Sequence, residues 1–369
     1  MVKILHLADF HLDSPMDALP PAKATERRAE LRETIMRAVQ LANETGVQII
    51  LIPGDLFDGA SVFYETAEAV SRELAKARAR VFIAPGNHDY YAPGSIYTSI
   101  RWSDNVHVFT SQKIERVQVP ELGLSVYGAA FTAPACDMGL LRGFRADPDD
   151  ISIMVMHGDV GQLNSRYNPI GIIDIQESGL DYLALGHVHA FSGIQRVGTT
   201  AYAYPGCIEG RGFDELGDKG AIVGIVSKGN SEFTFLPLAR RRYLSLDLNI
   251  TGLAKAEIVE RIINGFGHGS ERDIVRIILK GEQEMNDAVS VDIENEVRDA
   301  FYHVLVHDET RIKQDLWQDS DSDTLRGQFL RRMKEELDKA QDDARREEIE
   351  LAVRFGIAAI EKRELSDGI

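Results

Sequence analysis

The feature that most constrains the fold is a series of short apolar runs, each of which stops at a polar or turn-forming residue. Residues 2–8, 47–52 and 80–84 are runs of this kind, and their lengths are typical of buried strands. Between them lie residues 26–45 and 62–79, where apolar side chains recur at helical spacing. Strands that alternate with helices predict parallel pairing, with loops gathered at the carboxyl ends of the strands.

Further strands are expected downstream, and most of them follow one another without long helices. They are predicted at 105–109, 114–119, 124–128, 151–156, 181–185, 192–197, 221–226 and 233–239. This spacing favours a large mixed sheet, or two packed sheets, over a simple doubly wound sheet.

Three consecutive arginines at 240–242 mark a change of pattern. The residues that follow alternate between predicted strands and helices, at 243–250, 253–266, 272–279, 288–299 and 300–306. From about Thr324 the chain is charged and helical, with a stripe that includes Phe329, Met333 and Leu337. The predicted fold class is therefore α/β: packed mixed β-sheets flanked by helices, a small α/β domain and a helical C-terminal extension. The predicted domains are 1–240, 241–308 and 309–369.

Charge and cysteine content narrow the function classes. The chain has 369 residues, with 41 Lys and Arg against 58 Asp and Glu, for a net charge of −17. This balance argues against a protein that coats nucleic acid through its overall charge, but it leaves room for a local basic groove or an acidic metal site. Two cysteines, Cys136 and Cys207, form no CxxC pair, and no apolar stretch approaches the ~20 residues that span a bilayer. We expect a cytoplasmic protein with no membrane contact.

Asp, Asn and His residues gather where the predicted strands end. The residues concerned are Asp9, His11, Asp55, Asp58, Asn87, His88, Asp89, His157, His187 and His189. Imidazole and carboxylate ligands together suit divalent ions such as Mn²⁺, Fe²⁺ or Zn²⁺. Since no thiolate accompanies them, a structural zinc site is disfavoured.

The spacing of these residues predicts two ions. Asp9 and His11, like His187 and His189, are separated by one residue, which places both side chains of each pair on one side of an extended strand end. Two ions that lie ~3.5–4 Å apart share a carboxylate. Asp55, in a tight turn preceded by a glycine, is the best candidate for that carboxylate.

Each motif taken alone has an ordinary structural explanation. A single Asp-x-His arises by chance, and a Gly-Asn-His-Asp run occurs as a simple turn. Five such motifs at five strand ends are hard to explain as core histidines. The other histidines are assigned structural or surface roles, with His6 in the core: His6, His107, His268, His303 and His307.

The ordered motifs resemble those of a known superfamily. The set D-x-H, G-D-x-x-D, G-N-H-D, H-G and G-H-x-H looks like the calcineurin-like metallophosphoesterases. The forms LHLADFHLDSP, PGDLFDG, PGNHD and LALGHVH, with the stretch at 204–220, resemble the bacterial DNA-repair exonuclease branch, the SbcD-type nuclease subunit. The likeness covers 1 to about 240. The domain at 241–308 is similar to the capping domain of that family.

The resemblance implies roles for single residues. One metal ion would be held by Asp9, His11, Asp55 and His189, and the second by Asp55, Asn87, His157 and His187. His88 would face the phosphate and protonate the leaving oxygen or stabilise the transition state. Asp89 would orient His88 through a hydrogen bond. Archaeal and eukaryotic members of the family carry histidine at the position of Asp58, and an aspartate there matches the bacterial pattern. Asp58 would either touch a metal-bound water or only brace its loop.

Contacts with the substrate are less constrained by the sequence. Tyr91 and Arg166 either stack on bases and contact phosphates or are ordinary loop residues, and Arg211 is placed to reach backbone phosphate. The arginines at 240–242 either line the approach to the site or form a solvated linker.

The resemblance also implies partners. The C-terminal helices would dock on a coiled-coil ATPase subunit of the SbcC type, or else simply pack on their own domain. A homodimer is expected, with core burial as the alternative for its candidate residues: Val62, Phe63, Ile96, Tyr97 and Trp102.

The predicted function is phosphodiester hydrolysis of DNA, as an exonuclease or endonuclease in double-strand-break repair. The reaction would depend on two divalent ions. Mn²⁺ is the metal that we expect, and Fe²⁺, Zn²⁺ and Mg²⁺ are the alternatives. Two other functions stay open. One is a metallophosphoesterase acting on nucleotides or other small phosphodiesters, and the other is a repair scaffold with weak catalysis.

Overall fold

Two six-stranded β-sheets pack face to face in the larger part of the molecule. The computed structural model describes residues 1–59, 62–283, 289–313 and 316–361. The first sheet has the order β14 (Glu232–Pro237), β13 (Gly220–Val226), β1 (Val2–His6), β2 (Ile49–Ile52), β3 (Arg80–Ile83) and β4 (Val106–Val108). Strands β1 to β4 pair in parallel, and β13 joins β1 and β14 antiparallel. The first three strands and their parallel pairing agree with the prediction.

The second sheet is also mixed. Its order is β11 (Gln195–Val197), β12 (Thr200–Ala203), β10 (Tyr182–Gly186), β7 (Ile151–His157), β6 (Leu124–Ala129) and β5 (Glu115–Val119). The four central strands are parallel, and both edge strands are antiparallel. Ile4 and Ile49 of the first sheet share one buried core with Val155 and Ala184 of the second. The expectation of packed mixed sheets is confirmed.

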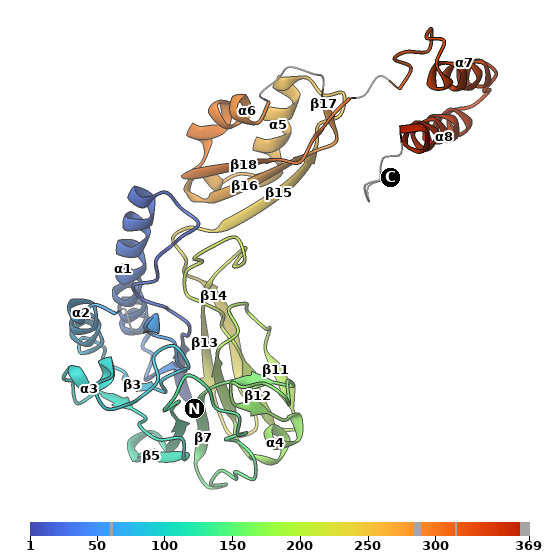
Figure 1. The fold of residues 1–369 in the computed structure, drawn as a ribbon. Helices are drawn as coiled ribbons and strands as arrows, with labels where there is room; N and C mark the ends of the chain where they lie inside the picture. Colours follow the sequence, from blue (N-terminus) through green and yellow to red (C-terminus); the bar gives the residue numbers. More distant parts are fainter. Residues whose placement is uncertain (60–61, 284–288, 314–315, 362–369) are drawn as a thin grey trace.

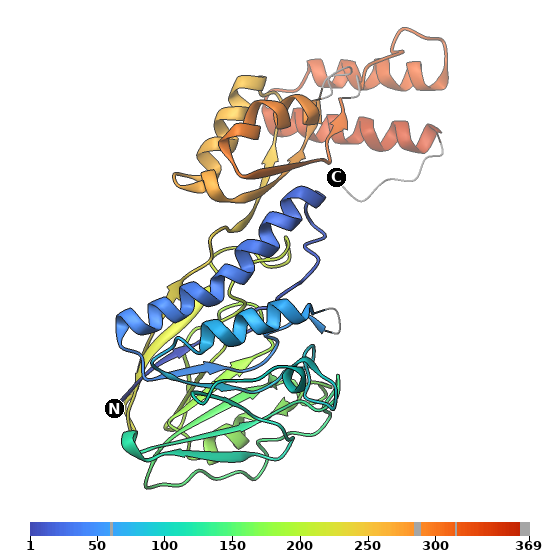
Figure 2. The same cartoon turned by 90° about the vertical axis from the view of Figure 1, so that its left-hand side faces the viewer.

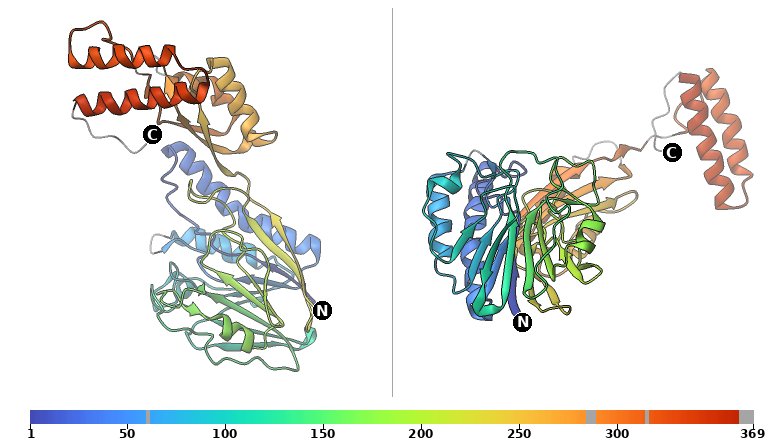
Figure 3. Two further views of the ribbon diagram at one scale, coloured as in Figure 1. Left: turned by 90° about the vertical axis from the view of Figure 1, so that its right-hand side faces the viewer. Right: turned by 90° about the horizontal axis from the view of Figure 1, so that it is seen from below.

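Helices cover the outer face of the first sheet. Helix α1 (Pro21–Thr45) and α2 (Tyr64–Leu74) lie on one side of it, as the right-hand view of Figure 3 shows, and α3 (Ile96–Ser99) follows β3. Helix α1 buries Leu31 and Ile35 with its other apolar positions, and it ends at Gly46, whose left-handed φ of 69° lets its backbone N–H cap the last turn. The second sheet carries α4 (Ile172–Glu177) on its own outer face.

A three-stranded parallel sheet forms a second unit with its own core. It has the order β15 (Tyr243–Asn249), β16 (Ile274–Lys280) and β18 (His303–Asp308), with α5 (Lys255–Phe266) and α6 (Val289–Val297) packed on it. Figure 1 shows this unit beyond the end of the two-sheet body. The structure thus contains the predicted small α/β unit. The exact domain boundaries stay predictions.

The remaining elements are short strand pairs and a C-terminal helical hairpin. The strand pairs are β8 (Asp159–Val160) with β9 (Pro169–Ile170), and β17 (Glu282–Gln283) with β19 (Arg311–Ile312). Helices α7 (Leu325–Asp338) and α8 (Asp343–Glu361) pack against each other. Arg354 of α8 forms an ion pair with Glu282 of the small unit at 3.0 Å. The last eight positions of the predicted 309–369 extension lie outside the described residues.

The arginines at 240–242 form ion pairs rather than a free linker. Arg241 Nη2 lies 2.6 Å from Glu30 Oε1 of α1, and Arg242 Nη2 lies 2.6 Å from Asp273 Oδ2 beside β16. Figure 2 shows α1 running from the two-sheet body toward the small unit, so the Arg241–Glu30 contact spans the junction, whereas Arg242 and Asp273 pair beside the strands of the small unit. The arginines were expected either to line the approach to the site or to form a solvated linker. Neither expectation describes them fully, because their side chains form ion pairs within the protein.

Candidate metal centre

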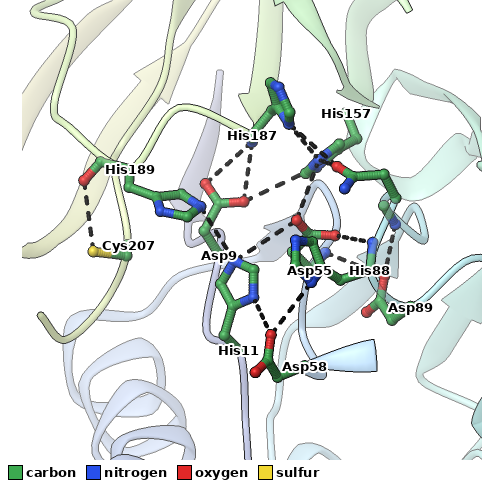
Figure 4. Close-up of polar contacts among 12 residues, drawn as sticks. Asp9, His11, Asp55, Asp58, His88, Asp89, His157, His187, His189 and Cys207 are labelled. Carbon is green, nitrogen blue, oxygen red and sulfur yellow. Dashed lines mark hydrogen bonds and ion pairs between the residues drawn. The ribbon is translucent and has the colours of Figure 1, made fainter. Parts of the chain in front are cut away.

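The predicted ligands converge because the strands that carry them end at the same edge of the packed sheets. Asp9 and His11 follow β1, Asp55 follows β2 and Asn87 follows β3. The second sheet contributes the histidine at the end of β7 and the two after β10. Figure 4 shows side chains from both sheets pointing toward one another. The sequence expectation that these loops meet is met by the structure.

Four of these residues hold unusual backbone conformations. Asp9 has a φ of 49°, His11 46°, Asp55 49° and His187 108°. Such left-handed values cost a non-glycine residue of order 1–3 kcal/mol and persist only where the surroundings enforce them. Strain in four residues at three neighbouring strand ends is typical of a functional site rather than of simple turns.

Two glycines allow the loops to approach closely. A Cβ on Gly86 would lie 2.2 Å from Asp55 Oδ1 and 2.7 Å from the Asp55 backbone nitrogen. A Cβ on Gly186 would lie 1.9 Å from the carbonyl oxygen of Pro53. Only glycine fits at these positions, as expected from the glycine beside each motif.

One half of the centre is built by Asp9, His11 and His189. Ligand atoms of these three residues all lie within 4.8 Å of one another. The Nε2 atoms of His11 and His189 are 3.2 Å apart, and Asp55 Oδ2 is 3.7 Å from His11 Nε2.

The other half is built by Asn87, His157 and His187. Asn87 Oδ1 lies 2.9 Å from His157 Nε2 and 3.2 Å from His187 Nδ1, and the two ring nitrogens are 3.2 Å apart. Asp55 Oδ2 is 3.4 Å from His157 Nε2. One oxygen of Asp55 therefore faces both halves, which is the position predicted for a shared ligand.

Acceptors outside the first half determine which ring nitrogen faces inward. His11 Nδ1 lies 3.0 Å from Asp58 Oδ1, and His189 Nδ1 lies 2.8 Å from Glu215 Oε1. Each carboxylate takes the Nδ1–H, so each Nε2 presents its lone pair to the centre.

The second half follows the same logic with different acceptors. The Nδ1–H of His157 donates to the carbonyl oxygen of Pro53 at 2.9 Å. His187 is turned the other way: its Nε2 lies 3.6 Å from Asp159 Oδ2, and its Nδ1 faces inward. Each of the four histidines thus turns one ring nitrogen toward one small region.

The electrostatics of the centre fit a divalent cation. Burial raises the pKa of the Asp9 carboxyl well above its usual range, and the Asp55 carboxylate raises it further. Burial lowers the pKa of His157 to about 4 and also lowers the pKa of His11. These imidazoles therefore stay unprotonated at neutral pH beside carboxylates that repel each other. A cation bound between them accepts the lone pairs and relieves the repulsion.

The structure places His88 beside Asp58, where its catalytic role stays a prediction, and it corrects the role of Asp89. The His88 side chain is 45% exposed, and its Nδ1 lies 3.3 Å from Asp58 Oδ1. Asp89 instead accepts from the backbone N–H of Gly86 and Leu56, at 2.7 and 2.8 Å. It also accepts from the Tyr97 hydroxyl at 2.6 Å. The prediction that Asp89 orients His88 is wrong, because its carboxylate turns toward the amides of the two metal-site loops and holds them together.

The three predicted substrate contacts lie in different surroundings. Arg211 reaches the centre, with Nη1 3.9 Å from Asp58 Oδ1, although Glu215 engages its guanidinium at 2.6 Å. Tyr91 is half-buried and packs against the cores of the first sheet. Arg166 is 75% exposed and pairs with Asp137 at 3.5 Å. Only Arg211 is brought to the metal centre, and all three substrate roles stay predictions.

Sequence reasoning did not single out Glu215 or the Pro53 carbonyl. Glu215 lies 26 residues after His189 in no recognised motif, and its one signal was the stretch at 204–220. A backbone carbonyl such as that of Pro53 leaves no signal in the sequence. Asp58, whose role was left open, contacts both His11 and His88.

With this geometry in view, comparison with known proteins identifies the family. The family model described as "Calcineurin-like phosphoesterase" matches residues 2–191, just over half of the chain. The chain belongs to the calcineurin-like phosphoesterase family. Metallophosphoesterases of this family use divalent metal ions, and the His and Asp side chains described above form groups that could bind them.

Curated relatives divide between an uncharacterised enzyme and repair proteins. The chain is 30% identical over 243 residues to the "Uncharacterized metallophosphoesterase YhaO" of Bacillus subtilis, a match that covers 63% of this chain and 59% of YhaO. It is 24% identical to the "DNA double-strand break repair protein Mre11" of Saccharolobus solfataricus, over 84% of this chain and 83% of that protein. It is 22% identical to the Methanopyrus kandleri protein of the same name, over 76% of this chain and 63% of that protein.

A solved structure is similar at a low level. A dimetal phosphatase from Danio rerio aligns with a TM-score of 0.40 and 12% identity, over 61% of this chain and 92% of that one. Within the described part of the chain, no helix has the length and apolar character needed to cross a membrane.

Proposed function

We propose that this metallophosphoesterase hydrolyses phosphodiester bonds of DNA with two divalent ions, Mn²⁺ first. The observation that carries the two-ion proposal is the Asp55 oxygen that faces both halves of a complete ligand set. The similarity to two archaeal Mre11 proteins over most of the chain supports DNA as the substrate. The SbcD-type branch stays part of the proposal.

The ligand roles follow the two halves of the centre. Asp9, His11 and His189 would hold one ion, and Asn87, His157 and His187 the other, with Asp55 shared. When bound, the ions would neutralise charge on the scissile phosphate and activate the attacking water.

The residues around the centre supply orientation and proton transfer. The Nδ1 of His88 faces Asp58, which leaves the rest of the half-exposed ring directed to the substrate side. A proton on that side would go to the leaving oxygen as the P–O bond breaks. Arg211, held by Glu215, would add positive charge near the phosphate.

A direct assay tests this function. Purified protein with Mn²⁺ is given linear double-stranded DNA, circular single-stranded DNA and bis(p-nitrophenyl) phosphate. We expect cleavage of DNA that His88→Asn lowers by at least ~10²-fold, while Mn²⁺ binding stays nearly intact. His268→Asn, a change at an exposed residue of the small unit, is the control. Hydrolysis of small diesters without cleavage of either DNA would favour the small-substrate alternative. Metal binding without any hydrolysis would favour the scaffold.

We also propose that the C-terminal hairpin docks on a coiled-coil ATPase subunit. The apolar stripe predicted for docking includes Phe329, Met333 and Leu337. Part of this stripe packs within the hairpin, because the Phe329 ring lies against Gly356 of α8. Leu325, Leu351 and Phe355 stay exposed and are the better candidates.

A homodimer belongs to the same proposal. Its candidate residues are divided by the structure, because Tyr97 is buried and bonded to Asp89 whereas Phe63 is 57% exposed. Phe63, with Val62 beside it, is therefore the better candidate for an interface.

A further inference from the structure

The loop between β12 and β13, residues 204–219, supports one ligand of the metal centre. Glu215 Oε1 lies 2.8 Å from Nδ1 of His189, and Lys219 Nζ donates to the His189 carbonyl oxygen at 2.9 Å. Cys207 contacts the same carbonyl oxygen, with its Sγ at 3.5 Å, as Figure 4 shows. Three side chains of one loop thus hold both the ring and the backbone of this ligand.

Within this loop, residues 211–215 form a tight turn that faces two parts of the molecule. Arg211 joins the ends of the turn, because its backbone N–H donates to Glu215 Oε2 at 2.8 Å and its guanidinium to Glu215 Oε1 at 2.6 Å. Both side chains face the metal centre, where Arg211 Nη1 lies 3.9 Å from Asp58 Oδ1. Phe213, in the middle of the turn, packs against the small unit instead.

Two strands of the small unit hold the Phe213 ring. The Arg276 guanidinium of β16 lies over the ring, 4.8 Å from its centroid, and Arg276 Nε donates to Ser245 Oγ at 3.2 Å. Tyr243, the fully buried first residue of β15, meets the ring edge to face, with centroids 5.1 Å apart and planes at 90°. The carbonyl oxygen of Tyr243 also accepts the backbone N–H of Gly217 at 3.0 Å. The turn is therefore held between the small unit and the metal centre.

We propose that Phe213 and Arg276 are positioning residues through which the small unit sets the geometry of the metal centre. Their contact fixes the turn, and the turn orients His189 through Glu215. Loss of either side chain should weaken binding of the ion beside His189 and slow turnover. The inference rests on the proposed function for its effect on turnover, but not for its effect on metal binding.

The test uses the full-length chain and measures metal binding apart from turnover. Phe213→Ala, Arg276→Ala and the double variant are compared with the wild type by calorimetric titration with Mn²⁺ and by kcat and KM for bis(p-nitrophenyl) phosphate at saturating Mn²⁺. We expect each single variant to weaken one Mn²⁺ site about 10-fold and to lower kcat about 10-fold. The double variant should be no worse than the weaker single variant, because both changes remove the same contact. Phe213→Tyr keeps the ring and should stay within about 2-fold of the wild type.

Two controls separate positioning from a general loss of stability. Lys280→Ala changes a residue on the same face of β16, farther along the strand, whose Nζ pairs with Asp247 at 2.6 Å. It should leave Mn²⁺ affinity and kcat unchanged. Ile258→Val removes a methyl group from the core of the small unit. It should lower stability in denaturant unfolding without changing Mn²⁺ affinity or kcat.

Several results would overturn the inference. They are an unchanged Mn²⁺ affinity in both single variants, an unchanged kcat at saturating Mn²⁺, and independent losses that multiply in the double variant. A loss of affinity in Ile258→Val as large as in Phe213→Ala would also reject it. If Phe213→Ala does not fold, Arg276→Ala decides alone, since that side chain is partly exposed. If the wild type binds Mn²⁺ but hydrolyses no diester, the proposed function fails, and the Mn²⁺ affinities alone decide the inference.

Discussion

At the scale of single residues, the centre depends on positions where no side chain fits. Gly86 donates its N–H to Asp89 at 2.7 Å, and a Cβ at this position would lie 2.2 Å from Oδ1 of the shared ligand Asp55. Because the backbone of Gly86 lies against Asp55, a methyl group added to Gly86 would displace the ligand that both halves of the centre share.

Gly86→Ala should therefore damage metal binding more than folding. The added methyl would overlap Asp55 Oδ1 and its backbone nitrogen, and relief requires the loop to move. We expect Mn²⁺ affinity to fall at least ~10-fold and stability to fall by about 1–3 kcal/mol, measured by calorimetric titration and by denaturant unfolding. Gly229→Ala, with a φ of +71° but no atom within 4 Å of the new methyl, should cost only about 1 kcal/mol and leave the affinity unchanged. Equal effects of the two changes would contradict this account.

Burial of His6 is expected to make the stability of the protein depend on pH. It is fully buried between the sheets, with Nδ1 2.8 Å from the Tyr182 hydroxyl and Nε2 3.1 Å from the Leu185 carbonyl oxygen. Burial lowers its pKa to about 3, against a partial rise from the Leu185 bond. Because the unfolded chain takes up this proton near pH 6.5, stability should fall between pH 6.5 and 3 by up to about 1.4 kcal/mol per pH unit.

The variant His6→Gln isolates this contribution. Urea unfolding with chelator at pH 7, 6 and 5 should show a shallower loss of stability for the variant than for the wild type. Parallel curves for the two proteins would show that His6 does not carry the effect.

The site could be predicted from the sequence as far as its residues follow strand ends. Asp55 and His157 needed only the positions of β2 and β7 to be placed together. The role of Asp89 could not be predicted, because its neighbour His88 points to Asp58 while Asp89 turns to backbone amides. Glu215 was missed because it reaches His189 only through the fold of a distant turn.

At the scale of elements, helix α1 joins the sheet to the junction with the small unit. Its Arg27 is fully buried, forms a close ion pair with Glu30 and contacts Glu209 Oε2 at 2.9 Å. The sequence predicted the apolar face of α1 but not this charged one. The partner of Arg27, Glu209, lies 182 positions along the chain, and Arg241, which pairs with Glu30, lies 211 positions along. It also missed β12, a strand of only four residues.

Breaking this buried network should destabilise the protein strongly. Arg27→Ala leaves Glu30 and Glu209 with less compensation away from water, so a loss of about 3–5 kcal/mol is expected in chemical unfolding. Arg72→Ala, at an exposed site 3.7 Å from Glu68, should cost less than about 1 kcal/mol. A loss below about 1 kcal/mol for Arg27→Ala would mean that the remaining charges rearrange.

At the scale of the whole molecule, the metal centre and the C-terminal hairpin lie in separate parts of the chain. In the views of Figure 1 and Figure 2, α7 and α8 lie beyond the small unit, away from the two packed sheets. With a net charge of −17, the DNA binding that we propose would have to come from local positive groups rather than from overall attraction.

Removing residues 320–369 should therefore separate docking from catalysis. We expect the shortened chain to lose co-purification with a coiled-coil ATPase subunit, because the exposed Leu325, Leu351 and Phe355 are gone. Hydrolysis of bis(p-nitrophenyl) phosphate should stay within about 2-fold of the full chain, because residues 320–361, the described part of the deleted segment, contact the small unit through Arg354 and Glu282 and lie away from the two packed sheets. Retained co-purification would reject the docking role.

The most direct test of the central claim is anomalous X-ray diffraction from Mn²⁺-soaked crystals of the wild type and of Asp55→Ala. The wild type should show two peaks ~3.5–4 Å apart, both within ligand distance of Asp55, one beside His11 and His189 and the other beside His157 and His187. Asp55→Ala should lose at least one peak. A single peak in the wild type, or two unchanged peaks in Asp55→Ala, would contradict a two-ion centre built around Asp55.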